Sequence, residues 1–253
     1  MSNFLRYSGY YDLLYGDKDY AGEADYVARR LREVAPATRS VLELGSGTGR
    51  HGRLLAGLGF DIHGVEQSAD MVALARRSGA AGPGSFDCEV GDLRAVRLGR
   101  SFDAVIALFH VISYQTGNDD LLAAFGTAVA HLPEGGVFLF DVWHGPAVLT
   151  ERPSRRTKQA ADAARRVRRL ADPRLDTEAA VVTVRFDLEC EDLASGHVER
   201  FSEDHRMRYL FPTEIDLLAR ATGFAVLRSE EFLTGAPPSE RSWGVAYMLR
   251  KRA

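Results

Sequence analysis

The chain has 253 residues, 45% of them hydrophobic and 26% charged, a composition typical of one large globular domain or a domain with an insertion. Its formal net charge of −3 gives no general attraction to nucleic acid or to an anionic membrane. No apolar run approaches the ~18 residues of a membrane span, and residues 1–6 lack the pattern of a signal peptide, so we expect a cytoplasmic protein. Cys88 and Cys190 lie far apart without metal-ligand spacing, and we expect reduced thiols and no bound metal.

The first half of the chain alternates predicted strands with predicted helices. Apolar runs predict strands at 40–44, 60–65, 86–90, 102–109 and 137–142, and helical periodicity covers 50–58, 69–77 and 118–132. The run 102–109 is nearly all apolar, as expected for a strand buried on both faces of a sheet. Repeated strand–helix units predict a doubly wound α/β fold, a mostly parallel sheet with helices on both faces.

A different pattern follows Trp143. Residues 181–190 alternate apolar and polar side chains, and 197–211 alternate again near their end, which predicts half-buried antiparallel strands. The basic stretch 155–170 fits a solvated helix or an exposed strand, and we favour strands because its neighbours are strands. We therefore expect an antiparallel β insertion at about 144–210, within a single domain that spans 1–253.

The α/β pattern resumes after the insertion. Thr213 and Asp216 resemble a capping box that opens a helix at 214–222, and strands are predicted at 224–227 and 244–249.

Three glycines, Gly45, Gly47 and Gly49, separate the first predicted strand from a helix. Such a turn lets the backbone approach a ligand closely and directs N–H groups at it from the helix start. Residues 47–52 also fit G-x-G-x-x-G, so a dinucleotide, a phosphate and S-adenosylmethionine are all candidates. The dinucleotide fit has the wrong phase, because Gly45 and not Gly47 closes the strand.

Two acidic residues follow the next strands. Glu66 closes the second predicted strand, where a carboxylate can accept both ribose hydroxyls, and Asp92 follows the third, where it can accept from an adenine amino group. Each alone is equally well explained as an exposed loop residue or a helix cap. Ligands of open α/β sheets bind at the carboxyl ends of the strands, so the three features together favour S-adenosylmethionine.

Five segments resemble the class I S-adenosylmethionine-dependent methyltransferases, in the family's order: 42–49, 64–71, 91–93, 102–106 and 132–136. The resemblance implies the Rossmann-like methyltransferase fold, with seven strands of which the last is antiparallel. It implies S-adenosyl-L-methionine as cofactor, with the glycines around the methionine moiety, Glu66 on the ribose, and Met71, Asp92 and Leu93 at the adenine. With these, the expected cofactor-binding residues are Tyr11, Tyr20, Glu43, Gly45, Ser46, Gly47, Gly49, Glu66, Gln67, Met71, Asp92, Leu93 and Leu108.

The flanking segments 10–20, 66–71 and 205–211 resemble bacterial sugar N-methyltransferases that act on nucleotide-linked amino sugars, and 141–146 resembles methyltransferases of surface-polysaccharide loci. This resemblance implies lid helices within 1–35. Tyrosines such as Tyr11 and Tyr15 can cover a sulfonium cation with their ring faces, or simply anchor an amphipathic helix.

Histidines near the strand ends are the candidates for catalysis at the methyl acceptor. His110 follows the fourth strand, His144 follows the fifth and His205 faces inward, so each is a candidate catalytic residue, although a lone histidine is often structural. A neutral amine needs mainly alignment, whereas a hydroxyl needs a base or a metal. The expected substrate contacts are Tyr15, Ser113, Tyr114, Trp143, Arg206 and Arg208. The two arginines face away from His205; they either hold a sugar diphosphate or lie on a solvated, ion-paired face.

We therefore expect methyl transfer from S-adenosylmethionine to a small polar acceptor, and we favour the amine of a nucleotide-linked amino sugar. The alternatives are an O-methyltransferase of a sugar or small metabolite, and a non-catalytic cofactor-binding protein with the same fold. We expect no nucleic-acid partner, since residues 108–112 lack the Pro-Pro motif of base methyltransferases and 165–169 is the one basic run. The insertion is interpreted as a lid, as the surface of a homodimer, or as both.

Overall fold

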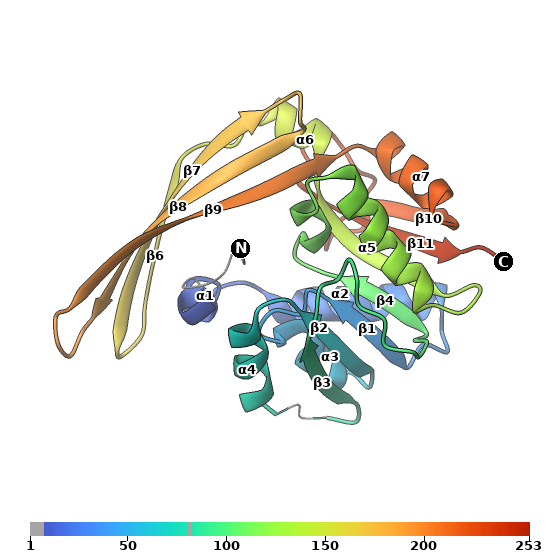
Figure 1. Ribbon diagram of the computed structural model, residues 1–253, viewed down its shortest axis with the longest axis horizontal. Coiled ribbons are helices and arrows are strands. Elements are labelled where there is room, and N and C mark those ends of the chain that lie inside the picture. The colour runs from blue at the N-terminus through green and yellow to red at the C-terminus, as the bar shows by residue number, and fades with distance from the viewer. Residues whose placement is uncertain (1–7, 80–81) are drawn as a thin grey trace.

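Seven strands form the central sheet of the molecule (Figure 1). The computed structural model describes residues 8–79 and 82–253, so the first seven residues of the predicted lid region lie outside the described residues. In spatial order the strands are β3 (Ser85–Val90), β2 (Asp61–Glu66), β1 (Ser40–Leu44), β4 (Ala104–Ala107), β5 (Val137–His144), β11 (Gly244–Lys251) and β10 (Phe224–Glu231). The first five are mutually parallel and β11 is antiparallel to both neighbours, which confirms the predicted fold class.

Helices cover both faces of this sheet. They are α2 (Tyr20–Val34), α3 (Arg50–Gly57), α4 (Ala69–Arg77), α5 (Asn118–Ala130) and α7 (Pro212–Ala221). In β5, Phe138 and Phe140 pack with α5 and α7, whereas Val137 and Leu139 pack with α2 and α3. Burial on both faces explains why these strands read as continuous apolar runs.

The insertion is a long antiparallel sheet that extends to one side of the central sheet (Figure 1). After the short helix α6 (Gly145–Thr150) it contains β6 (Arg156–Ala161), β7 (Arg165–Asp176), β8 (Val181–Asp192) and β9 (Val198–Leu210). The expectation of strands over 155–170 is thus confirmed. β9 returns beside the end of β5 and pairs with it in parallel through Trp143–Tyr209 and His144–Leu210.

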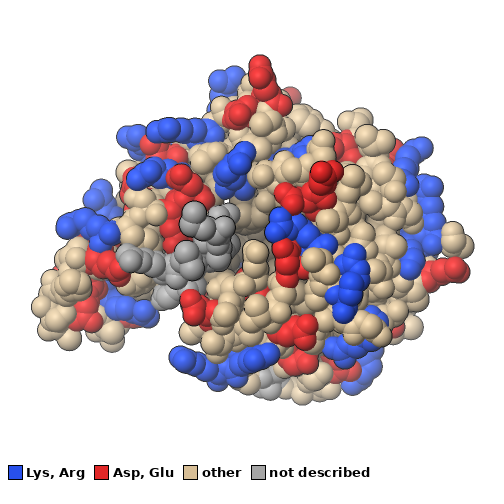
Figure 2. Space-filling model, viewed as in Figure 1, with Lys and Arg blue, Asp and Glu red and all other residues tan. Residues whose placement is uncertain are grey.

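The basic run at the start of β7 is matched by acids across the sheet. Arg166 on the outer face pairs with Glu191 at 2.7 Å, and Arg200 pairs with Glu189 at 2.8 Å. On the side of the molecule seen in Figure 2, basic and acidic side chains are interspersed over the insertion. Such an ion-paired, solvated surface is ordinary for the exposed face of an antiparallel sheet.

The helix after the insertion begins two residues earlier than the sequence predicts. Pro212 is the first residue of α7, a position that suits proline. The Glu214 carboxylate accepts from the backbone N–H of Phe211 at 3.4 Å, while Asp216 pairs with Arg220 at 2.8 Å, so the proposed Thr213–Asp216 capping box is wrong.

Among residues 8–79 and 82–253, no helix combines the length and apolar character that a membrane crossing requires.

Candidate active site

A cavity of ≈ 610 Å³ lies at the carboxyl ends of the parallel strands, between the central sheet and the insertion. Most residues predicted for the cofactor line it, namely Tyr11, Tyr20, Gly45, Ser46, Gly47, Glu66, Gln67, Met71, Asp92, Leu93 and Leu108. The predicted acceptor-side residues that line it are Tyr15, His110, Tyr114, Trp143 and His205. Side chains that sequence reasoning missed also line it: Thr48, Arg50, His51, Arg94, Phe109, Val111, Gln115, Val184, Phe186 and Met207.

The glycine turn between β1 and α3 forms one wall of the cavity. Gly45 has φ +72°, and a Cβ there would lie 2.6 Å from Cγ1 of Val111, so only glycine fits both the conformation and the space. Gly47 also has a positive φ, of +55°, and its N–H donates to the Glu66 carboxylate at 3.0 Å. The backbone of this turn is therefore exposed to the cavity and held in place from β2.

Glu66 joins the glycine turn to the start of α4. Its second oxygen accepts from the backbone N–H of Ser68 at 2.8 Å, and Ser68 in turn caps α4 by accepting from Met71 N–H at 3.3 Å. Burial raises the pKa of Glu66, against the opposing effect of these backbone donors. A carboxylate offers about four lone-pair positions, so both oxygens can accept further hydrogen bonds from a ligand.

Asp92, after β3, is held in place by Arg94. Its carboxylate accepts from the Arg94 backbone N–H at 2.9 Å and from Nη2 of Arg94 at 2.6 Å. Arg94 reaches on to Asp120 of α5 at 2.8 Å. The hydrogen bonds from the Arg94 side chain hold the pKa of Asp92 below its usual range, so the carboxylate stays ionised beside the cavity.

Two predicted cofactor residues lie outside the cavity. Glu43 is 1% exposed beneath the glycine turn, where a Cβ on Gly52 would lie 2.7 Å from its carboxylate, and burial raises its pKa to about 8. Gly49 packs against the ring of Phe86, 2.5 Å from where its Cβ would be. Both residues thus support the glycine turn from behind and do not line the cavity, although the sequence predicts them to bind the cofactor.

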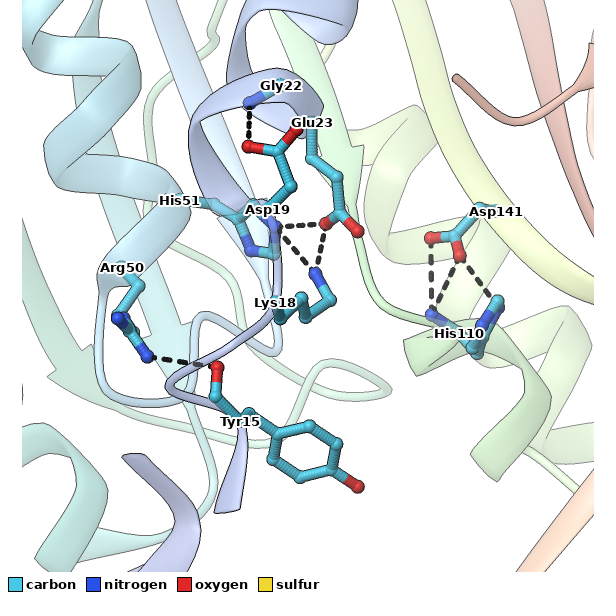
Figure 3. Close-up of polar contacts among 9 residues, drawn as sticks. All are labelled: Tyr15, Lys18, Asp19, Gly22, Glu23, Arg50, His51, His110 and Asp141. Atoms are coloured by element: carbon cyan, nitrogen blue, oxygen red, sulfur yellow. Dashed lines mark hydrogen bonds and ion pairs between the residues drawn. The ribbon is translucent and has the colours of Figure 1, made fainter. Parts of the chain in front are cut away.

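His110 is paired with a buried aspartate on the neighbouring strand (Figure 3). Asp141 of β5 is fully buried, and both its oxygens lie 3.1 Å from the His110 backbone nitrogen, which donates to them. Nδ1 of the His110 ring lies 2.7 Å from Oδ2 of Asp141. Burial by itself would raise the pKa of Asp141, but the charge and hydrogen bonds of His110 outweigh it and lower that pKa.

This pairing depends on an unusual backbone. β4 ends at Ala107, two residues before the predicted end, and Phe109 and His110 both adopt left-handed conformations with φ of +64° and +62°. Such conformations are costly for non-glycine residues and occur where surrounding contacts enforce them, often at functional sites. Sequence reasoning missed Asp141, although a carboxylate within an otherwise apolar strand was a usable signal.

His205 reaches the cavity from the inner face of the insertion. Its Nδ1 lies 3.1 Å from the hydroxyl of Tyr114, which belongs to the short 3₁₀ helix η1 (Val111–Tyr114). The Phe186 ring lies 4.6 Å from the His205 ring. Burial raises the pKa of Tyr114, so its hydroxyl stays protonated.

Four other predicted residues do not line the cavity. His144 is 3% exposed where β5 joins α6, and burial lowers its pKa. Ser113 is fully buried, and its hydroxyl accepts from the Trp143 backbone N–H at 3.1 Å. Arg206 is exposed on the outer face of β9, and Arg208 pairs with Glu214 and with Oδ1 of Asn118 at 2.8 Å. Because strand residues alternate between faces, both arginines point away from the cavity that His205 lines.

The helix α1 (Ser8–Leu14) and the turn after it cover the cavity. The Thr48 hydroxyl donates to the Asp12 carboxylate at 2.9 Å. Nη1 of Arg50 donates to the Tyr15 carbonyl at 3.4 Å (Figure 3), so the cover is attached to the glycine turn. The rings of Tyr11 and Tyr15 lie 4.7 Å apart.

Beside this cover, Lys18 forms a buried cluster with Glu23 and His51 (Figure 3). The His51 Nε2 lies 2.6 Å from the Glu23 carboxylate, and the Lys18 ammonium lies 4.3 Å from the centre of the Phe109 ring. Burial lowers the pKa of both Lys18 and His51. The cluster therefore supports the strained Phe109 segment from the side of α2.

In this doubly wound sheet, the glycine turn after β1 and the carboxylate of Glu66 at the end of β2 meet at one site. That combination defines the class of nucleotide-binding α/β proteins. Comparison with known proteins narrows the class. Residues 41–136 match the family described as "Methyltransferase domain". The dTDP-3-amino-3,4,6-trideoxy-alpha-D-glucopyranose N,N-dimethyltransferase of Streptomyces venezuelae is 31% identical over 90% of this chain and 92% of its own length. The dTDP-3-amino-3,6-dideoxy-alpha-D-glucopyranose N,N-dimethyltransferase of Streptomyces fradiae is 32% identical over 90% of this chain and 85% of its own length.

A solved structure agrees with these relatives. The SAM-bound amino pentose methyltransferase from Micromonospora echinaspora has a TM-score of 0.74 and 26% identity, covering 97% of this chain and 96% of that one. The chain belongs to the S-adenosylmethionine-dependent methyltransferases. It is an enzyme, and S-adenosyl-L-methionine is its cofactor. The residues present suit that group, since the exposed glycine-turn backbone and the Glu66 carboxylate lie at one edge of a cavity with room beyond them.

Proposed function

We propose that this enzyme methylates the amine of a nucleotide-linked amino sugar. The observation that carries the proposal is the continuity of the cavity, which extends from the glycine turn past His110 to Val184 and Phe186 on the inner face of the insertion. The cavity therefore has two ends, of which one suits the methyl donor and the other is lined by the insertion. The similarity to two dTDP-amino-sugar N,N-dimethyltransferases over most of both chains supports the choice of acceptor.

For the donor end, we assign Glu66 to the ribose hydroxyls and Asp92 to the adenine edge. The backbone of the glycine turn and the rings of Tyr11 and Tyr20 then enclose the methionine portion. When bound, S-adenosylmethionine supplies a methyl group on a positively charged sulfur. Aromatic ring faces attract such a cation, which suits the tyrosines that line this part of the cavity.

For the acceptor end, we assign His110 as the group that takes the proton from the sugar amine. An ammonium has no lone pair with which to form a new bond, so it must lose a proton before or during methyl transfer. Asp141 holds the His110 ring through Nδ1 at 2.7 Å and stabilises the imidazolium that forms. His205 on the insertion and Tyr114 on η1 then position the sugar. The cover formed by α1 and the turn that follows it, with Tyr11 and Tyr15, excludes water from the cavity.

The test is methyl transfer with defined acceptors. The protein is incubated with S-adenosylmethionine and dTDP-3-amino sugars, and the products are analysed by mass spectrometry for one and two added methyl groups. The matched control is the dTDP sugar with a hydroxyl in place of the amine. Methylation of the hydroxyl sugar in preference to the amine contradicts the proposal and favours the O-methyltransferase alternative. Binding of S-adenosylhomocysteine without turnover of any acceptor favours the non-catalytic alternative.

A homodimer that uses the insertion stays a prediction, as does the cytoplasmic location. Sedimentation equilibrium of the purified protein, with and without residues 152–200 of the insertion, tests the first.

A further inference from the structure

The inner face of the insertion carries an arginine that the function described so far does not use. On β7, Val167 is fully buried and Arg169 lies on the same side, whereas Arg166 and Arg168 are exposed on the opposite side. Strand residues two apart share a face, so Arg169 points toward the cavity side of the sheet. It is the inward-facing counterpart of Arg206 and Arg208, which the sequence suggested for a diphosphate and which point outward.

Aromatic rings that line the cavity hold the Arg169 guanidinium. Its central carbon lies 4.5 Å from the centre of the Phe186 ring and 5.4 Å from the centre of the Tyr15 ring. Nη1 of Arg169 also donates to the Tyr15 hydroxyl at 2.9 Å. Both rings are part of the cavity wall. Stacking engages the flat faces of a guanidinium, whereas phosphate oxygens bind along its edge, so the two interactions are compatible.

The opposite end of the cavity, beside the glycine turn, disfavours an anion. At the opposite end lie the carboxylates of Glu66 and Asp92, which repel a phosphate. There Arg94 is already bound to Asp92 and Asp120. On the insertion side, Lys158 pairs with Asp17 at 2.6 Å, and Glu203 lies 3.6 Å from Nε2 of His205.

The rings on which Arg169 stacks connect it to the proposed reaction centre. The Tyr15 ring lies 5.2 Å from the ring of Phe109, the residue before His110. The Phe186 ring lies 4.6 Å from the His205 ring. The cavity therefore continues from the two rings that hold Arg169 to His110 and His205, which also line it. An acceptor whose sugar carries an anionic group on one side and an amine on the other can place the anion at Arg169 and the amine near His110.

We propose that Arg169 binds the diphosphate of the nucleotide-linked acceptor and so makes the enzyme specific for activated sugars over free ones. The proposal rests on the proposed function, since it names the residue that recognises the charged half of that acceptor. Arginine suits the role because its planar donor edge binds phosphate oxygens in pairs. Tyr15 couples the site to the cover, because its hydroxyl accepts from the same guanidinium.

The test measures binding of dTDP and thymidine, by titration calorimetry, to protein saturated with S-adenosylhomocysteine. The variants are Arg169→Gln and, as matched control, Arg168→Gln on the outer face of the same strand. We expect Arg169→Gln to weaken dTDP binding by about ten- to a hundredfold, the effect of losing a charge-assisted hydrogen bond to phosphate. We expect it to leave thymidine and S-adenosylhomocysteine affinities unchanged, and Arg168→Gln to change none of the three.

Several outcomes overturn the assignment. Unchanged dTDP affinity in Arg169→Gln does so, and so does a wild-type protein that binds no dTDP. An equal loss of dTDP and S-adenosylhomocysteine affinity means that Arg169 only positions the Tyr15 cover. Arg169→Lys provides a second test if the glutamine variant fails to fold, and an affinity for dTDP equal to that of the parent also contradicts paired recognition. Binding of dTDP is measured without turnover, so a failure of the proposed methylation is seen separately in the acceptor assay.

Discussion

Replacing Asp141 by asparagine tests whether the buried carboxylate acts through His110. The amide has nearly the same shape, so the change keeps the packing and removes the charge. In the parent, both oxygens lie 3.1 Å from the His110 backbone nitrogen and Oδ2 lies 2.7 Å from Nδ1 of the ring. The amide keeps a single oxygen, and its NH2 group must face one of these donors.

The magnitude follows from the hydrogen bonds that are lost. Exchanging a charge-assisted hydrogen bond for a neutral one costs about 1–2 kcal/mol. If that cost falls on the state in which His110 is protonated, the rate falls by roughly 5- to 30-fold. We expect kcat to carry this loss with KM little changed. The pH–rate profile should also change, because in the parent the charge of His110 acts directly on Asp141 and lowers the pKa of that carboxyl.

The assay is steady-state methylation of a dTDP-amino sugar by Asp141→Asn from acid to alkaline pH. S-adenosylhomocysteine affinity is measured alongside, to verify that the cavity is intact. Asp172→Asn serves as the control, since that carboxylate pairs with Arg155 in the insertion, away from the cavity. Parental kcat and an unshifted pH profile in Asp141→Asn would show that His110 takes no proton in the rate-limiting step.

Three further variants test the donor end. Glu66→Gln should weaken S-adenosylhomocysteine binding by about 1–2 kcal/mol, because the amide lacks the charge that accepts from Gly47 N–H and, in our proposal, from the ribose. A parental affinity measured by calorimetry removes Glu66 from the site. Gly45→Ala should lower the free energy of unfolding by about 1–3 kcal/mol and abolish tight cofactor binding. The reason is that the new Cβ would lie 2.6 Å from Cγ1 of Val111, at a residue whose φ is +72°. An alanine variant that melts and binds like the parent refutes this steric argument. Glu43 has a pKa of about 8 in the folded protein against an ordinary 4.5, so the folded state holds a proton that the unfolded chain releases as pH rises. Stability should therefore fall between about pH 4.5 and 8, and Glu43→Gln should flatten this dependence in thermal melts; equal slopes in both proteins contradict the assignment.

The donor end was the part that the sequence could predict. Strand periodicity locates the carboxyl ends of β1, β2 and β3, and the glycines, Glu66 and Asp92 occupy those ends. Because parallel strands end at the same edge of a sheet, the local sequence pattern is enough to predict that residues at all three ends line one cavity. The repeated units predicted the mostly parallel sheet, whereas its seven strands with the last one antiparallel were implied by the resemblance to the methyltransferase family. Glu43 and Gly49 are the two residues predicted for this end that do not line the cavity.

The acceptor end could not be predicted in the same way, because its contacts join distant parts of the chain. His110 and His144 both follow strands in the sequence, yet the early end of β4 turns His110 toward the cavity while the pairing of β5 with β9 buries His144. The partnership of Asp141 with His110 depends on two left-handed residues that no periodicity reveals. For Arg169, the alternation of β7 was obscured by the surrounding basic run.

The way the insertion joins the central sheet bears on how such enzymes diverge. The chain leaves the core after β5 and comes back beside the same strand, where two residue pairs, Trp143–Tyr209 and His144–Leu210, connect the returning strand to it. The points where the chain leaves and rejoins the central sheet are thus neighbours. Such sites tolerate the insertion of whole domains in other folds. Natural selection can change or replace the insertion between those two points without altering the central sheet, which carries the donor end of the cavity. A common methylating core can in this way adapt to new acceptors through changes in one segment.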